Sequence, residues 1–377
     1  MSLNPDEYTL VRSVSEEQYS KATFHSHFEW GYQIMTMPEY FERQRLLGDL
    51  EFAKGKTTTW LFGKKEAFES NKESLDFYCN SESIETKVLI KRYDSDKIVE
   101  GTSHSIPTVV CHKEHRGRKY GQLMLSKLHS ELSQITQVST LNSDIGKEFY
   151  ARFGWDAYDS IICKVPVTCN IIEQIQHKQD TKFTTAPIDP EVAKKLSLAD
   201  IGTIKRELLS LEPKNTTKVV MLPEYSWYEW RWVRDKYEGC DIMGVKQIPK
   251  VFGAYINSDL GGMKFESNDE FFEDIDAPSF LIWTQRFREE CLMVLRSRIN
   301  KAEDIIPLLE AAVLEAKKFD LPKVVFWNVD PKCHDILKDQ FGAELDELDK
   351  CIPCMTLFDK RPDEKVEWIA NENYAYV

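Results

Sequence analysis

A short basic loop, Arg116 to Gly121, carries the clearest chemical signal in the sequence. It follows an apolar run that ends near His112 and opens a stretch whose apolar residues recur at helical spacing. Backbone N–H groups and the helix dipole bind phosphate at a helix start, and glycines let the ligand approach closely. The loop therefore predicts a phosphate or pyrophosphate cradle, although a strand–turn–helix junction with solvated basic side chains has the same pattern. Neither the Walker spacing nor the G-x-G-x-x-G spacing is present.

A second segment, Leu141 to Trp155, lies downstream of the predicted cradle helix. Asn142 or Ser143 can cap a short helix that carries Tyr150. In such a helix a tyrosine usually belongs to the core. A phenol of pKa about 10 is also protonated at neutral pH, so this side chain could serve as a proton donor.

The order of the two segments resembles the acetyl-coenzyme A binding core of the GNAT acetyltransferases. In that family Arg-Gly-x-Gly-x-Gly opens the cradle helix, and an Asn-x-x-Ala-x-x-x-Tyr-x-x-x-Gly-Phe segment follows. Lys119 stands at the middle glycine position and Ser143 at the asparagine position, departures that would tighten the loop or weaken a coenzyme contact. The matching residues are Arg116, Gly117, Gly121, Gly146, Tyr150, Gly154 and Trp155.

This resemblance implies acetyl transfer from acetyl-coenzyme A to an amine, without a metal. Backbone groups of Val109, Val110 and Cys111, on a strand that diverges from its neighbour, would bind the pantetheine arm. The Val110 N–H is the expected oxyanion donor, and Tyr150 is the expected acid for the departing thiolate. The remaining coenzyme contacts are expected at Arg116, Gly117, Arg118, Lys119, Tyr120, Gly121, Gln122, Asn142 and Ser143.

The acceptor amine needs its own binding groups. A lysine side chain of pKa about 10.4 arrives as an ammonium and must lose a proton to a carboxylate or a histidine. We expect Glu85 to bind the ammonium and His104 to act as the base, although such a glutamate is usually solvated and a single histidine is usually structural. Trp230 and Arg234, in an aromatic segment, would form a wall and a carboxylate clamp, unless that segment is core or domain interface.

The elements that must position these residues alternate between extended and helical patterns, which predicts a mixed α/β fold. We expect a GNAT-like, mainly antiparallel sheet flanked by helices in residues 1–168. The polar stretch 169–190 lacks periodicity and is interpreted as a linker or crossover. Residues 191–377 repeat a similar rhythm and predict a second α/β domain, a diverged repeat that contributes to the substrate site. Aromatic residues in the last stretch, 368–377, predict a packed tail.

Composition limits the partners. The chain has 377 residues, with 62 acidic and 49 basic side chains and a formal net charge of −13. This charge argues against binding to nucleic acids or anionic membranes and weakly favours a cationic substrate. No apolar run reaches the roughly 18 residues of a membrane span, and the polar, acidic start lacks a signal peptide, so a cytoplasmic location is expected. The nine scattered cysteines indicate reduced thiols. The sequence does not fix the oligomeric state.

A narrower resemblance extends over most of the chain. The segments 141–155, Ser83-Ile-Glu-Thr86, Trp230-x-Trp-x-x-Arg234 and Trp368-x-x-Asn-Glu-x-Tyr374 resemble the fungal lysine acetyltransferases. This resemblance implies direct acetyl transfer, in a ternary complex, to the side-chain amine of free lysine during lysine degradation. Three alternatives stay open: a protein-lysine acetyltransferase, a polyamine acetyltransferase, and a coenzyme-binding regulator without catalysis.

Overall fold

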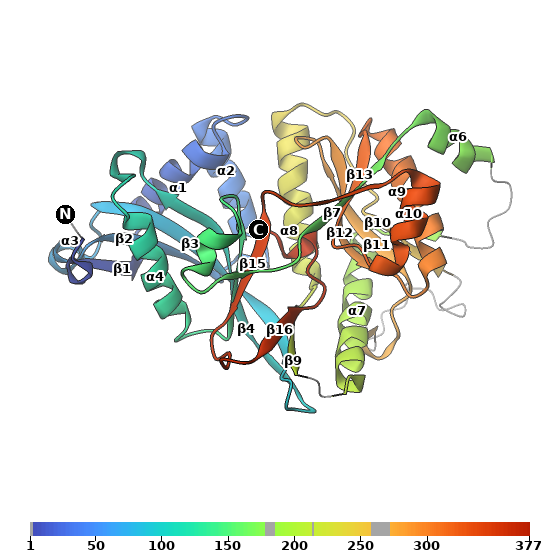
Figure 1. Ribbon diagram of the computed structural model, residues 1–377. Helices are drawn as coiled ribbons and strands as arrows, with labels where there is room; N and C mark the ends of the chain where they lie inside the picture. Colours follow the sequence, from blue (N-terminus) through green and yellow to red (C-terminus); the bar gives the residue numbers. More distant parts are fainter. Residues whose placement is uncertain (1–2, 178–184, 213–214, 258–271) are drawn as a thin grey trace.

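Two mixed sheets with covering helices make up the molecule, in a computed structural model that describes residues 3–177, 185–212, 215–257 and 272–377 (Figure 1). The expected mixed α/β class is confirmed, with antiparallel strand pairs in the majority. The main helices are α1 (Glu16–Trp30), α2 (Met37–Gly48), α3 (Lys65–Ser70), α4 (Tyr120–Leu132), α5 (Lys147–Ala151), α6 (Cys169–His177), α7 (Pro190–Ser210), α8 (Tyr225–Lys236), α9 (Ile305–Lys318) and α10 (His334–Phe341).

The first sheet has the order β1-β2-β3-β4-β5-β15-β6, and β9 and β16 extend it beside the far end of β3. The β4–β5 pair is parallel, and its ladder ends where Ile106 pairs with Leu141, although β4 continues to Cys111. The two strands therefore diverge, as the sequence predicts. The strands are β1 (Tyr8–Arg12), β2 (Thr57–Lys64), β3 (Phe77–Lys91), β4 (Ile98–Cys111), β5 (Val138–Ser143), β6 (Asp156–Ala157), β9 (Thr216–Met221), β15 (Ile352–Leu357) and β16 (Lys365–Trp368).

The second sheet repeats the core of the first. In both, an antiparallel pair leads through a helix into a parallel strand, which is followed by an antiparallel strand and a short edge strand. Helix α9 takes the place of α4, and α10 takes that of α5. The strands are β7 (Ile161–Pro166), β8 (Thr185–Pro187), β10 (Gly253–Ile256), β11 (Phe280–Arg286), β12 (Cys291–Arg298), β13 (Lys323–Trp327) and β14 (Glu344–Glu347).

The two sheets exchange strands across residues 169–190. Strand β15, from the C-terminal half, lies between β5 and β6, and β7, from the N-terminal half, lies between β13 and β14. The division into domains at this stretch stays a prediction. The expected loss of periodicity there is wrong at its start, because Ile171, Ile172 and Ile175 form an apolar face of α6 that packs on the second sheet's core.

Helix α8 lies between the two sheets in Figure 1, and the C-terminal segment packs against it. The ring of Tyr374 is fully buried, 6.0 Å from that of Trp227, and its hydroxyl donates to the Met221 carbonyl at 2.6 Å. The buried guanidinium of Arg231 donates to the carbonyls of Asn373 and Tyr376. The tail is thus part of the core that joins the sheets.

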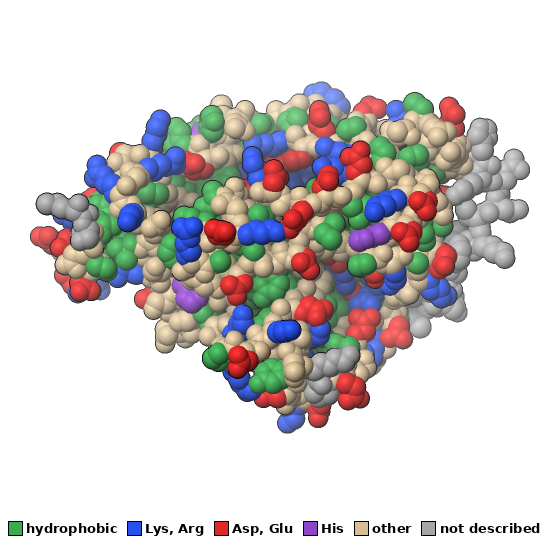
Figure 2. Space-filling model, in the orientation of Figure 1, with side chains coloured by type: hydrophobic (Ala, Val, Ile, Leu, Met, Phe, Trp, Pro, Cys, Tyr) green, Lys and Arg blue, Asp and Glu red, His purple; other side chains and the backbone are tan. Residues whose placement is uncertain are grey.

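The surface carries both signs of charge. On the face shown in Figure 2, acidic and basic side chains are interspersed rather than gathered by sign. No helix in the described ranges is long and apolar enough to cross a membrane.

Truncating the buried tail ring should destabilise the fold. We expect Tyr374→Ala to lower the free energy of unfolding by about 3–5 kcal/mol, because it leaves a cavity where an aromatic side chain was packed. Tyr374→Phe removes only the hydrogen bond to Met221 and should cost about 1 kcal/mol. Urea denaturation of the two variants and the wild type measures both values; equal losses would contradict the packing role.

Candidate active site

The loop predicted to be a phosphate cradle lies at the N-terminus of α4. Gly117 has a φ of +76°, and Lys119, directly before the helix, has a φ of +64° in the left-handed region. Lys119 therefore takes the backbone conformation that glycine adopts at low cost, at a penalty of about 1–2 kcal/mol. The substitution of the middle glycine leaves a glycine-like turn in place, with the first N–H groups of α4 free of intrahelical partners.

Basic side chains surround this loop. The Arg116 Nε donates to the Cys111 carbonyl at 2.9 Å, and its guanidinium pairs with Glu29 of α1. Arg118 and Lys119 are exposed. An anion bound at the cradle would meet two exposed cations and a third that is already paired to a carboxylate.

The β3–β4 ladder turns the Val110 N–H away from the gap between β4 and β5. The His112 N–H donates to the Tyr78 carbonyl at 2.9 Å, and hydrogen-bonded pairs alternate along an antiparallel ladder. Val110, two residues earlier, is therefore bonded to β3. The register therefore does not favour the expected role of the Val110 N–H as the oxyanion donor. The N–H groups that face the gap are those of Val109 and Cys111.

Tyr150 lies on α5, beside the end of β5, and is 9% exposed. Burial, with smaller effects of Cys354 and Asp144, raises the pKa of its phenol to about 12. Its hydroxyl makes no hydrogen bond to the described residues. The group is therefore a protonated, unengaged donor at neutral pH.

Two of the predicted coenzyme residues have side chains that are engaged elsewhere. Asn142 donates from Nδ2 to the Cys351 carbonyl at 3.1 Å. The Ser143 hydroxyl donates to the Gly146 carbonyl at 2.7 Å and accepts from the Ile145 N–H. Both side chains hold the turn between β5 and α5, so any coenzyme contact at these positions falls to the backbone.

A cavity of about 390 Å³ adjoins the gap. Pro107 and Thr108, in the part of β4 beyond its last pair with β5, form one wall, and α8 forms another. Glu82 of β3 faces this cavity and is 9% exposed. Burial raises the pKa of its carboxyl to about 7, with Thr108 and Arg43 opposing the shift. A buried carboxylate that titrates near neutrality is suited to accept a proton.

Glu85 and His104, the two acceptor-side groups predicted on the central strands, lie on the opposite face of the sheet. Glu82 and Ile84 line the cavity, so the alternation of β3 turns Glu85 away, and Glu85 is exposed. His104 is opposite Glu85 in the ladder, and its Nδ1 is 3.1 Å from the Ser83 hydroxyl. Burial lowers the pKa of His104. Neither residue lines the cavity, so the structure does not bring either of them to the place where we propose that the amine binds.

The sequence pattern did not indicate Glu82, because Glu82 lies one residue before the Ser83-Ile-Glu-Thr86 segment, which contains Glu85. The two glutamates differ only in which face of the sheet their positions along β3 place them on. Ile84 could have shown which glutamate faces the interior. An apolar strand residue usually faces the core, and Glu82, two residues earlier, lies on the same face of the strand as Ile84.

Arginine side chains also line the cavity. Trp230 and Arg234 of α8 are among the lining residues, and the Arg234 guanidinium carbon is 5.3 Å from the Trp230 ring centroid. Arg234 donates to Asp235 at 3.0 Å. Arg286, at the end of β11, donates to Glu289 at 2.5 Å, but its buried Nε has no hydrogen-bond partner among the described residues. The cavity thus contains the Glu82 carboxylate and two paired guanidinium groups, one of which keeps a free N–H donor.

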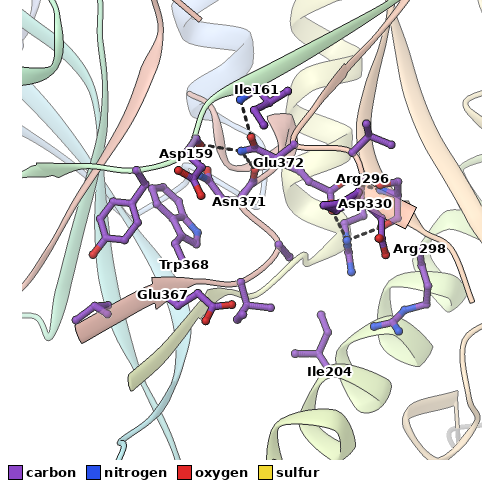
Figure 3. Close-up of a pocket in the computed structure, with 18 of the residues that line it drawn as sticks. Asp159, Ile161, Ile204, Arg296, Arg298, Asp330, Glu367, Trp368, Asn371 and Glu372 are labelled. Atoms are coloured by element: carbon purple, nitrogen blue, oxygen red, sulfur yellow. Dashed lines mark hydrogen bonds and ion pairs between the residues drawn. The ribbon is translucent and has the colours of Figure 1, made fainter. Parts of the chain in front are cut away.

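A larger cavity, of about 1210 Å³, lies at the corresponding gap of the second sheet (Figure 3). Here β12 and β13 also part after two paired residues, but the C-terminal segment fills the space between them. The Glu372 carboxylate accepts from the Ser297 N–H at 2.6 Å, and Asn328 donates to the Asn371 carbonyl at 2.7 Å. The turn before α9 carries Glu303 and lacks glycine. This cavity therefore has no phosphate cradle.

One group of possible metal ligands occurs in the described part of the chain. Ligand atoms of His25, His112 and Glu114 lie within 4.8 Å of one another. The two imidazole rings are stacked, 3.4 Å apart and 7° from parallel. In this arrangement the nitrogen lone pairs lie in parallel planes and do not converge on one ion.

The comparisons with known proteins agree with this geometry. Residues 171–377 match the family described as the LYC1 GNAT-like C-terminal domain. A lysine acetyltransferase of Yarrowia lipolytica is 22% identical over 389 residues, covering 91% of this chain and 90% of the relative.

Solved structures of similar fold include a probable N-acyltransferase from Enterococcus faecalis, with a TM-score of 0.56, 11% identity, and coverage of 93% of this chain and 72% of that one. A GCN5-related N-acetyltransferase from Kribbella flavida gives a TM-score of 0.52 at 11% identity, with coverage of 94% and 72%. The GNAT fold that the sequence predicts is confirmed.

The geometry predicts one coenzyme site for each chain, at the first gap. We expect calorimetry with coenzyme A to give one equivalent per chain, and Gly117→Ala to weaken binding at least tenfold by shifting the cradle N–H groups. Gly244→Ala is the matched control, because Gly244 has the same φ of +76° and equally open surroundings. Both variants should lose about 1–2 kcal/mol of stability. Two equivalents of coenzyme, or equal binding by both variants, would contradict the assignment.

Proposed function

The chain belongs to the family of the LYC1 GNAT-like C-terminal domain and is a GNAT-type N-acetyltransferase, and on that premise we propose that it acetylates the side-chain amine of free lysine. Acetyl-coenzyme A is the donor, and transfer is direct, within a ternary complex. A role in lysine degradation and a cytoplasmic location belong to the same proposal. The observation that carries it is Glu82, a carboxylate of pKa about 7 in the cavity beside the coenzyme gap.

The coenzyme lies with its pyrophosphate on the loop Gly117 to Gly121 and its pantetheine arm along the open edge of β4. This edge offers the N–H and carbonyl groups of Val109 and the N–H of Cys111, since the Cys111 carbonyl already accepts from Arg116. The arm then adds to the sheet as a strand would. In this geometry the Val109 or Cys111 N–H replaces that of Val110 as the donor to the tetrahedral oxyanion.

Glu82 takes a proton from the lysine ammonium, and the neutral amine then attacks the thioester carbonyl. Tyr19 and Tyr40 line the same cavity, and burial, with a smaller effect of the Glu82 charge, raises the pKa of each phenol to about 12. Their rings offer faces to a cation. When the tetrahedral intermediate collapses, the C–S bond breaks, and Tyr150 donates its proton to the coenzyme thiolate.

Free lysine is favoured over a protein side chain because the cavity also supplies partners for an α-carboxylate. Arg234 and Arg286 line the cavity, and although each pairs with a neighbouring carboxylate, the buried Arg286 Nε has no hydrogen-bond partner in the described part of the chain. A buried guanidinium with an unmade hydrogen bond is costly, and a carboxylate satisfies it. A polyamine or a peptide-bound lysine has no carboxylate at this position. These contacts would also be superfluous in a regulator that only binds the coenzyme.

The pH dependence should identify Glu82. Its pKa of about 7 lies above that of a free carboxyl, so the group is protonated and inactive below pH 7. We expect the wild-type kcat/KM for lysine to rise with pH through about 7. Glu82→Gln should lose this limb and fall about 10²- to 10⁴-fold at pH 8, the range for removal of a general base.

Stability separates this loss from misfolding. Because the folded-state pKa of Glu82 is raised to about 7, stability falls as the pH rises from the range of a free carboxyl to about 7 and stays reduced at pH 8, so Glu82→Gln should be no less stable than the wild type at pH 8. Glu85→Gln, three residues along the strand on the other face, is the control and should keep wild-type kinetics. If Glu85→Gln loses activity and Glu82→Gln does not, the assignment is wrong.

The preference among acceptor amines tests the proposed binding of the lysine α-carboxylate. The wild type should prefer lysine to cadaverine, which is lysine without its carboxylate. Arg286→Met should lower kcat/KM for lysine about 10- to 100-fold, the loss of a charged hydrogen bond of about 1.5–3 kcal/mol, and leave that for cadaverine unchanged. Arg45→Met, on the exposed face of α2, is the control. Preference for cadaverine or for a lysine-containing peptide would favour a polyamine or protein acetyltransferase instead.

A further inference from the structure

Cys79 and Cys111 are directly opposite each other in the β3–β4 ladder. The bonded pairs of this ladder include His112 with Tyr78, so the Cys79–Cys111 pair is a non-hydrogen-bonded one. In such pairs the Cα atoms are about 4.5 Å apart, within the roughly 4.4–6.8 Å that a disulfide bridges. The two side chains therefore lie on the same face of the sheet, and each affects the pKa of the other. A bond between them needs no rearrangement of the strands.

The two thiols differ in access and reactivity. Cys79 is fully buried, and Cys111 is half-buried at the end of β4. The neighbouring Cys79 thiol lowers the pKa of Cys111, and Arg116 and the Gly121 N–H lower it further, against the opposing effect of burial. An accessible thiol of low pKa next to a second thiol is the arrangement found at oxidisable cysteine sites.

We propose that Cys111 and Cys79 form an oxidation site for hydrogen peroxide, with Cys111 as the attacking thiol and Cys79 as the resolving thiol. The Cys111 thiolate attacks one peroxide oxygen, the O–O bond breaks, and hydroxide leaves, giving a sulfenic acid at Cys111. The Cys79 sulfur then attacks the Cys111 sulfur, the S–O bond breaks, and water leaves with the Cys79 proton. Two thiols are oxidised to one disulfide, and one peroxide is reduced to water. A dithiol reverses the reaction by exchange.

Oxidation of Cys111 should weaken coenzyme binding, a consequence that rests on the proposed function. A Cβ added at Gly121 would lie 3.9 Å from the Cys111 Cβ, so the Cys111 side chain borders the cradle, and Cys111 itself belongs to the strand edge assigned to the pantetheine arm. In the disulfide the Cys111 sulfur is drawn toward Cys79 of β3. We expect the oxidised protein to bind coenzyme A at least threefold more weakly and to regain affinity with dithiothreitol.

Peptide mapping of the whole protein tests the site without any assay of activity. After treatment with hydrogen peroxide, mass spectrometry should show a Cys79–Cys111 cross-link, which dithiothreitol removes. Cys79→Ala should instead accumulate Cys111 sulfenic acid, trapped by dimedone, because the resolving thiol is gone. Cys169→Ala, at an exposed cysteine of α6, should form the cross-link as the wild type does.

The result that overturns the proposal is a peroxide-treated wild type in which Cys79 and Cys111 remain thiols, or Cys111 advances to sulfinic acid without a cross-link. Coenzyme binding is measured separately on the same samples. A cross-link without any change in affinity would retain the oxidation site and reject its effect on the cradle. Failure of the protein to bind coenzyme A in either state would instead count against the proposed function.

Discussion

The unpaired edge of β4 beyond Ile106 is the constraint on which the site depends. A strand inside a sheet normally has both edges satisfied, because buried backbone groups without partners are costly. Here the parallel partner β5 turns away, and the antiparallel partner β3 satisfies only alternate residues. The groups of Val109 and the N–H of Cys111 are left facing a gap. The ligand that best satisfies such an edge is an extended chain with amides of its own, which describes the pantetheine arm.

The second sheet meets the same constraint in another way. Strands β12 and β13 also diverge, but the protein's own C-terminal segment enters the gap and satisfies it through Glu372 and Asn371. That segment continues past the buried Tyr374 to Tyr376, which lines the cavity beside the first gap. One repeat thus keeps an open gap, and the other uses its gap to anchor a wall of that cavity.

The local sequence pattern was sufficient to predict the glycine-containing loop before α4, α4 itself and the helix of Tyr150. Glycine spacing and helical periodicity are properties of neighbouring residues. The local pattern was insufficient to predict which face of a strand a side chain or a backbone N–H lies on. Glu82 and Glu85 differ only in the face of the sheet on which their positions along β3 place them. The direction of the Val110 N–H depends on the register between β3 and β4, which the bond from His112 to Tyr78 fixes. Arg286 lies more than a hundred residues from β4 and gives no local signal. Helix α6 was not predicted because its three isoleucines lie within a stretch that is otherwise mostly polar.

The strand exchange has a consequence for how the chain is made. The edge of β5 is covered by β15, residues 352–357, which are translated some two hundred residues later. Until then the N-terminal sheet leaves the ribosome with a bare edge, a state prone to pair with other chains. The nascent protein therefore needs protection over most of its synthesis, and a cut within residues 169–190 would yield two pieces that each lack a strand of their own sheet.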